Sequence, residues 1–298
     1  MTLFSYKVFV TIVEHMNFRA AADQLNLTPS AVSHCVSTME EELGFPLFVR
    51  QKNKISLTSD AKLLLPAIRQ VLRSEEAVSL LVEEINGLQR GTVRLGCFST
   101  VCISWMPQIL ERFKEEFPGI EVELFQGNYT DICRWIENGN IDIGFLSVSS
   151  AGTIPVEPLY EDPLVAVVPH GFSAKHKNYI EIAELQNQQY VQPAENGDAD
   201  SQKLLADHES FAATKCHVVD DLSMLKMVEA GCGVCILPKL LTDAYQVQVH
   251  VDTYPLKPAA NRVIGLAFYE PSKGVPAVQR LAQVIRDMIA EQSAKTEA

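Results

Sequence analysis

The feature that most constrains this chain is the stretch 17–58, which is patterned for two short helices joined by a tight turn. Asn17 is placed to cap the first helix at its N-terminal end. Thr28 and Pro29 then fit the N-cap and the first position of a second helix. Along that helix apolar residues recur at the spacing of one buried stripe: Val32, Cys35, Val36, Met39 and Leu43. The pattern predicts a helix-turn-helix.

The opposite face of the second helix carries short hydrogen-bonding side chains and no acid. These are Ser30, Ser33, His34 and Ser37. Such a face can lie against base edges and phosphates in a major groove, because nothing on it is bulky or repelled by phosphate. A solvated helical hairpin without a partner would show the same face, so this pattern alone leaves both interpretations open.

The residues after the second helix predict a basic β-hairpin. Gly44 ends the helix and Pro46 blocks its continuation. Strands are expected at 47–50 and 55–58, with the loop 51–54 between them. The hairpin carries three cations and no acid, which makes it a local phosphate-binding element. The cations are Arg50, Lys52 and Lys54.

These elements together resemble the winged helix-turn-helix of LysR-type transcriptional regulators. The resemblance is carried by Ala20-Ala21-Ala22 to Leu25, Thr28-Pro29-Ser30-Ala31-Val32-Ser33, Met39-Glu40-Glu41-Glu42-Leu43-Gly44, Leu47-Phe48-Val49-Arg50 and Leu57-Thr58. The length and layout match over essentially the whole chain, although the family usually has Gly where Ala61 stands. The resemblance implies a bacterial DNA-binding protein with a C-terminal domain that binds a small-molecule effector.

The resemblance also implies how the chain divides and which residues contact DNA. We expect a winged helix-turn-helix domain at 1–58, a linker and dimerisation helix with a hinge at 59–90, and an effector-binding domain at 91–298. The expected DNA contacts lie on the polar helix face and the basic hairpin. They are Thr28, Pro29, Ser30, Ser33, His34, Ser37, Arg50, Lys52 and Lys54.

Composition is consistent with more than one folded domain and shows where the charge lies. At 298 residues and 47% hydrophobic content, the chain is longer than an ordinary single domain and apolar enough for a packed core. Residues 1–90 hold 9 Lys and Arg against 10 Asp and Glu, a net −1, so −11 of the total −12 belongs to the rest. Non-specific attraction to phosphate is therefore modest, and binding should need an oligomer and a specific site.

The expected partners are double-stranded DNA, a small-molecule effector and further copies of the chain, as a homodimer or homotetramer. No apolar run reaches membrane-spanning length and no leader pattern is present, which predicts a cytoplasmic protein without a membrane partner. The 7 cysteines are then expected to be reduced. No cofactor and no metal are expected.

Residues 59–88 predict one long helix with a coiled-coil seam. Pro66 should kink this helix or mark a second start. The seam runs through Ala61, Leu64, Ile68, Val71, Glu75, Val78, Val82 and Ile85. An amphipathic helix packed on its own chain would give the same pattern, but the resemblance favours a linker that pairs two chains.

From residue 92 the sequence alternates between strand and helix patterns, which is typical of an α/β fold. Strands are predicted at 92–96, 120–125, 141–146, 164–168, 189–192, 216–219, 233–237, 247–251 and 262–269. Helices are predicted near 103–116, 129–138, 200–208, 222–230 and 276–291. The resemblance implies two lobes joined by two crossing strands, like periplasmic solute-binding proteins (type 2). Lobe I would comprise 91–161 and 268–291, and lobe II would comprise 162–267.

The ends of the predicted strands give the candidate effector site. At the loop 97–102, backbone N–H groups at a helix start could bind an anion together with two hydroxyls, although Thr100 could simply cap that helix. No Arg or Lys stands at these strand ends, so neutral donors would hold an acidic effector, or the effector is not strongly anionic. The candidate effector-binding residues are Phe98, Ser99, Thr100, Val101, Asn128, Ser147 and Gln192.

Two further interpretations rest on the cysteines and on the α/β part. Cys232 and Cys235 have the CxxC spacing of redox motifs and half zinc sites, but no second pair completes a zinc site, which favours core packing. A thiol switch at Cys97, Cys102 or this pair is the alternative regulator. An enzyme is disfavoured because the sequence has no nucleophile elbow and no Gly-rich phosphate loop.

Overall fold

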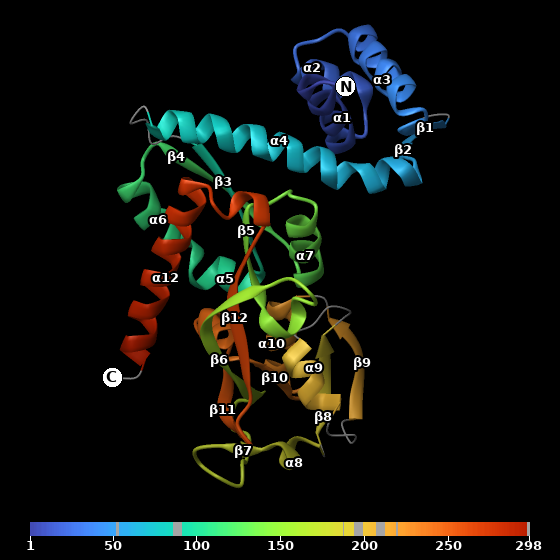
Figure 1. The fold of residues 1–298 in the computed structure, drawn as a ribbon. Coiled ribbons are helices and arrows are strands. Elements are labelled where there is room, and N and C mark those ends of the chain that lie inside the picture. Colours follow the sequence, from blue (N-terminus) through green and yellow to red (C-terminus); the bar gives the residue numbers. More distant parts are fainter. Residues whose placement is uncertain are drawn as a thin grey trace.

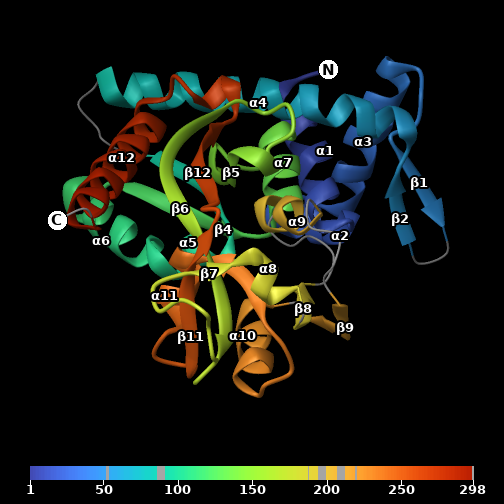
Figure 2. The same cartoon turned by 90° about the horizontal axis from the view of Figure 1, so that it is seen from below.

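The computed structural model describes residues 1–51, 54–85, 91–186, 188–193, 199–206, 212–218 and 220–296. Figure 1 shows a small N-terminal domain, one long helix and a two-lobed α/β part. In Figure 2 the long helix α4 runs along one side of the molecule, with the N-terminal domain at one end and α12 near the other. Among the described residues, no helix is both long and apolar enough to cross a membrane.

The N-terminal domain is the predicted winged helix-turn-helix. Its helices are α1 (Leu3–His15), α2 (Phe18–Gln24) and α3 (Pro29–Leu43), and its wing is β1 (Phe48–Gln51) paired with β2 (Lys54–Leu57). Asn17 Oδ1 accepts the backbone N–H groups of Arg19 and Ala20, as its capping position predicts. The stripe residues Val32, Val36 and Met39 are buried in the core of this domain, where α3 packs against α1 and α2.

Helix α4 (Ser59–Ile85) is continuous through Pro66, so the predicted second start is wrong. The prediction that the first half of the seam pairs two chains is also wrong. Ala61 and Ile68 are buried in the core of their own winged helix, and Leu64 packs against the same core. The second half differs, because Val71, Val78 and Val82 remain exposed.

Lobe I is a sheet with helices on both sides. Strand β3 (Gly91–Cys97) pairs in parallel with β4 (Ile120–Gln126) and β5 (Ile143–Ser147). Strand β12 (Asn261–Phe268) joins β5 in the antiparallel sense. The helical elements are α5 (Ser99–Ser104), α6 (Met106–Glu116), α7 (Tyr129–Glu137), η1 (Val148–Ser150), η2 (Glu270–Ser272) and α12 (Pro276–Thr296). The predicted single helix 103–116 is therefore two helices.

Lobe II is built on the far half of β6 (Val156–Pro169), which pairs with β10 (Cys235–Pro238) and β11 (Val251–Lys257). Strand β7 (Ile180–Glu181) adds to β11, while β8 (Gln189–Pro193) and β9 (Ala212–Val218) form a separate parallel pair. Its helices are α8 (Ile182–Leu185), α9 (Ala199–Ala206), α10 (Asp221–Glu229) and α11 (Lys239–Tyr245). The sequence did not predict β7, α8 or α11, and it placed β11 at 247–251.

The two lobes are joined by two crossing strands, β6 and β12, as the resemblance implied. One core cluster contains Ile264, Leu266 and Ala267 of β12, and a second contains Leu164–Val168 of β6. The chain therefore re-enters lobe I near Arg262, before the predicted boundary at 267. Each lobe has a core of its own, and the two crossing strands carry the chain between them.

Candidate DNA-binding and effector sites

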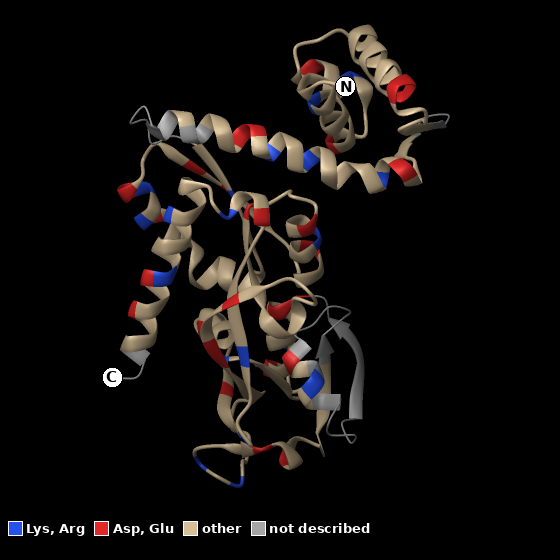
Figure 3. Ribbon diagram, viewed as in Figure 1, with Lys and Arg blue, Asp and Glu red and all other residues tan. Residues whose placement is uncertain are grey.

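The polar face of α3 is presented to solvent. Thr28 Oγ1 caps the helix by accepting the Ala31 N–H at 3.2 Å, and it lies 3.0 Å from Ser30 Oγ. Ser33 is half-buried, and the other predicted contacts on this face are exposed: Thr28, Pro29, Ser30, His34 and Ser37. Figure 3 shows α3 without a charged residue until its C-terminal end. Nothing on this face repels phosphate.

The wing is fixed to α3 by an acid at that C-terminal end. Glu40 Oε1 accepts the backbone N–H groups of Leu47 at 2.6 Å and Phe48 at 3.3 Å, so this carboxylate holds the start of β1. In the wing, Arg50 pairs with Ile55 and Gln51 pairs with Lys54. Lys52 lies outside the described residues, and of Arg50 and Lys54 only the backbone is described.

The hinge between the lobes carries a buried ion pair. Arg262 on β12 and Asp162 on β6 are direct cross-strand neighbours, with Nη2 and Oδ2 2.5 Å apart. Asp162 Oδ1 also accepts the Leu240 N–H at 2.9 Å. Both side chains are almost completely buried, at 3% and 0% exposed. The pair therefore joins the two crossing strands where the chain passes between the lobes.

Arg262 also faces two aromatic side chains at the predicted effector site. The sequence did not identify Arg262 as part of this site. Its Nη1 donates to Tyr129 Oη at 3.1 Å, and its guanidinium lies 5.1 Å from the centre of the Phe98 ring. The rings of Phe98 and Tyr129 are 4.9 Å apart. The sequence shows no Arg or Lys at the predicted strand ends, but the Arg262 guanidinium on the crossing strand β12 contacts the aromatic residues there.

The loop between β3 and α5 is placed as predicted, but the capping alternative is wrong. Phe98 occupies the N-cap of α5, and no side chain caps this helix. Thr100 and Val101 are buried, so they belong to the packing of lobe I. Ser99 is half-buried, and its Oγ accepts from Gln126 Nε2 at 3.4 Å.

The remaining effector candidates have separate roles. Asn128 caps α7 by accepting the Asp131 N–H at 2.8 Å. Ser147 is fully buried at the end of β5, and its hydroxyl donates to Asp200 of α9 at 2.9 Å. Gln192 lies on β8, but its side chain is not described. The structure thus brings Phe98 and Ser147 to the lobe boundary and adds Tyr129, Arg262 and Asp200.

The CxxC motif is divided between solvent and core. Cys235 is completely buried at the start of β10, and burial raises the pKa of its thiol far above the usual range. Cys232 is exposed, so the expectation of core packing holds for Cys235 and is wrong for Cys232. Gly233 between them has φ +158, and a Cβ there would lie 2.4 Å from Gln189 O. Within the motif, Gly233 lets the backbone pass close to the backbone of Gln189.

Cys97 and Cys102 lie together beside the effector residues. Cys97 is buried at the end of β3, and Cys102 is half-buried on α5. Burial and the neighbouring Cys102 thiol raise the pKa of Cys97 far above its usual range. Since the thiolate is the reactive form, this raised pKa disfavours Cys97 as a nucleophile.

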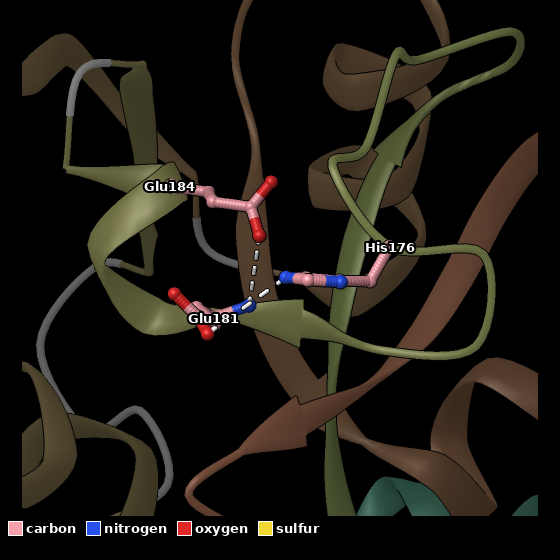
Figure 4. Close-up of side chains that lie close together, drawn as sticks. All are labelled: His176, Glu181 and Glu184. Atoms are coloured by element: carbon pink, nitrogen blue, oxygen red, sulfur yellow. Dashed lines mark hydrogen bonds and ion pairs between the residues drawn. The ribbon is translucent and has the colours of Figure 1, made fainter.

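Figure 4 shows a histidine and two carboxylates whose possible ligand atoms lie within 4.8 Å of one another. These residues are His176, Glu181 and Glu184. Glu184 already accepts the N–H groups of Lys175 at 3.0 Å and Glu181 at 3.2 Å, and His176 stacks on Tyr179 at 4.4 Å. These contacts within the loop before α8 and the start of α8 explain why the three side chains lie together, and a metal ion is not needed for this.

A joint between α4 and lobe I was not predicted. Arg73 donates from Nε and Nη2 to Gly139 O at 3.1 and 2.9 Å, and its Nη1 lies 3.6 Å from Asp142 Oδ1. Arg69 Nη1 donates to Asn140 Oδ1 at 2.9 Å. Burial raises the pKa of Asp142, which Arg73 and the Ser272 hydroxyl oppose. The end of α7 is thereby attached to the linker.

This joint borders a cavity of about 470 Å³ between the N-terminal domain, α4 and lobe I. Val10 and Glu14 of α1 line one side, and Arg94 and Phe125 of lobe I line the other. Lys7 on α1 also reaches Glu75 on α4 at 3.1 Å. All three parts of the chain therefore meet along α4.

Comparison with known proteins agrees with both halves of the molecule. Residues 3–62 match the family described as "Bacterial regulatory helix-turn-helix protein, lysR family", and residues 86–290 match the "LysR substrate binding domain". The chain belongs to the LysR family of transcriptional regulators. LysR-type regulators bind DNA and small-molecule effectors and act as oligomers.

Individual relatives extend over nearly the whole chain. An uncharacterized HTH-type regulator of Bacillus subtilis, YvbU, is 29% identical, and the match covers 90% of this chain and 91% of the relative. The dual regulator OxyR of Escherichia coli is 24% identical over 96% of this chain and 95% of its own length. A solved full-length OxyR variant from Pseudomonas aeruginosa has a TM-score of 0.78 at 20% identity, covering 96% of this chain and 95% of its own. The Bacillus subtilis and Escherichia coli relatives are both named as transcriptional regulators.

Proposed function

We propose that this protein binds promoter DNA in a sequence-specific manner through α3 and the wing, and that a small molecule bound between the two lobes controls its activity. The observation that carries the first part is the exposed, acid-free face of α3 beside a basic hairpin. The division into 1–58, 59–90 and 91–298 fits this function. DNA binding, dimerisation and effector binding then belong to these three parts of the chain in turn. A regulator that acts on bacterial DNA works in the cytoplasm, and it needs no catalytic residues of its own.

Base reading and phosphate binding should separate by mutation. We expect His34→Ala to change which sequence is preferred, because His34 stands on the exposed face of α3. Arg50→Ala should weaken all sequences about equally and lower the salt slope of binding by roughly one unit. Fluorescence anisotropy over a range of salt, together with selection from a mixed DNA pool, measures both effects. A His34 variant with lower affinity and an unchanged preference would refute the base-reading role.

The control of DNA binding requires a connection between lobe I and the linker, and the Arg73 joint supplies one. Arg73→Ala removes two hydrogen bonds to Gly139 O and the ion pairs with Asp142 and Glu76. We expect a loss of about 1–3 kcal/mol in the unfolding free energy of the effector-binding part, while affinity for DNA persists. Arg73→Lys should recover only part of this loss, because it keeps the charge and loses the forked geometry.

Lys62→Ala is the matched control for this experiment, since Lys62 is an exposed cation on the same helix. Denaturant unfolding of the three variants gives the comparison. Equal stability of the Arg73 and Lys62 variants would show that the joint adds nothing to the attachment of lobe I.

A thiol switch remains the second candidate function, since some relatives are named as hydrogen peroxide-inducible genes activators. Contact between Cys97 and Cys102 next to the effector residues supports it. The raised pKa of Cys97 opposes it, because a protonated thiol reacts slowly with peroxide. Counting free thiols after peroxide treatment separates the two functions. Loss of two thiols from Cys97 and Cys102 at low peroxide would favour the switch.

A further inference from the structure

The carboxylate of Asp200 crosses from α9 to lobe I and receives two hydrogen bonds on one oxygen. Ser147 Oγ donates to Asp200 Oδ2 at 2.9 Å, and Ser149 Oγ donates to the same atom at 2.7 Å. The two serine oxygens are themselves 2.9 Å apart. Helix α9 packs against η1 and β12 of lobe I. This contact therefore ties the lobes together at a point away from the crossing strands.

The two hydroxyls are arranged as a receptor for a carboxylate. Hydrogen bonds to an ionised carboxylate are shorter and stronger than those between neutral groups, and here two donors converge on one oxygen. Ser147 ends β5, and the carboxyl ends of strands are where open α/β sheets bind ligands. The strand partner of Ser147 is Ile264 on the crossing strand β12. None of these features requires the carboxylate to belong to the protein.

We propose that Ser147 and Ser149 form a carboxylate-binding subsite, that Asp200 fills it as a tethered ligand, and that the effector carries a carboxylate group that competes with Asp200. This inference rests on the proposed function, since it takes the effector to bind between the lobes. Without effector, Asp200 holds α9 against η1. An effector that takes over the two serine hydroxyls releases α9.

The test is chemical rescue of the full-length chain with acetate as the probe. Asp200→Ala removes the tethered carboxylate and leaves both donors. We expect a lower Tm and roughly tenfold faster hydrogen exchange in residues 143–150, the end of β5 and η1. Acetate should restore most of the lost Tm, relative to chloride at equal ionic strength. The wild-type chain should gain less Tm from acetate than the Asp200→Ala variant at each concentration, because the tethered carboxylate already occupies the subsite.

Two controls make the test specific. Asp252→Ala also removes a carboxylate with two hydrogen bonds, from Gly171 N and His170 Nδ1, but both partners lie in its own lobe. It should leave exchange in residues 143–150 unchanged and gain nothing from acetate. The double variant S147A/D200A should lose the rescue, because one of the two donors is gone.

The proposal is overturned if acetate raises the Tm of the Asp200→Ala variant no more than chloride does. Equal rescue of S147A/D200A, or unchanged exchange in residues 143–150 after Asp200→Ala, would also overturn it. Should the alanine variant fold poorly, Asp200→Asn keeps an acceptor oxygen without the charge. It should show intermediate exchange and no gain from acetate, and exchange equal to wild type would count against the proposed role of the Asp200 carboxylate. None of these readouts uses DNA, so failure here is distinguishable from failure of the DNA-binding proposal.

Discussion

Replacing Val78 and Val82 together with Asp should convert the protein to monomers and remove most of its affinity for DNA. Val71, Val78 and Val82 recur at intervals of seven and four on α4, which places them on one face of the helix. They are 43%, 61% and 51% exposed in the single chain. Burying each valine against a second chain contributes on the order of 1.5–3 kcal/mol. The double substitution loses this contribution from both chains and sets like charges opposite each other.

The effect should come from the exposed stripe and not from general damage to α4. Other residues of α4 pack on the winged helix and on lobe I, namely Ile68, Leu72 and Ala77, and the substitutions do not touch them. Gln70 and Ser79 are exposed on the flanks of the same helix, so Q70D/S79D adds the same charge without removing apolar surface. Light scattering gives the mass of each variant. A V78D/V82D variant that kept its oligomeric mass would place the pairing surface elsewhere, in the lobes.

Asp162→Ala should cost about 3–5 kcal/mol of unfolding free energy, because it leaves the Arg262 guanidinium buried without its counter-ion. The Leu240 N–H also loses its acceptor. Replacing both partners by apolar residues, as in D162L/R262M, should recover much of the loss, since desolvating the charges is itself costly. Denaturant unfolding of the full-length chain measures the unfolding free energies of the wild type, the Asp162→Ala variant and D162L/R262M.

Glu157 provides the matched control for the hinge pair. Its carboxylate also pairs with an arginine, Arg286, at 2.7 and 2.9 Å, but Glu157 is exposed. Glu157→Ala should therefore cost only about 0–1 kcal/mol. Equal costs for Asp162→Ala and Glu157→Ala would mean that burial adds nothing to the hinge pair.

Local signals in the sequence were sufficient for the N-terminal domain. Asn17, Thr28 and Gly44 act on backbone groups within a few residues, so their roles as caps could be predicted without knowledge of the fold. The strands of the α/β part were placed for the same reason, from short apolar runs between turn residues. The crossing of β6 and β12 came from the family resemblance and not from the pattern.

What the sequence did not predict depends on partners that are distant along the chain. Asp162 and Arg262 are 100 residues apart, and only the register of β6 with β12 brings them together. Asp200 reaches Ser147 across the lobe boundary, and Arg73 reaches Gly139 across a domain boundary. The coiled-coil seam predicted for α4 was partly wrong for a related reason. Some of its apolar residues pack on the winged helix of the same chain, and the others form an exposed stripe. Periodicity alone does not say which neighbour covers an apolar face.

The most direct test of the account is selection by the purified full-length protein from a pool of random double-stranded DNA. Because the account holds that an oligomer reads DNA through α3, the bound fraction should be enriched in a sequence with two related half-sites, spaced by about one helical turn or a multiple of it. Enrichment should disappear for V78D/V82D and change in sequence for His34→Ala. A bound fraction with the composition of the starting pool would contradict sequence-specific DNA binding, and with it the central claim.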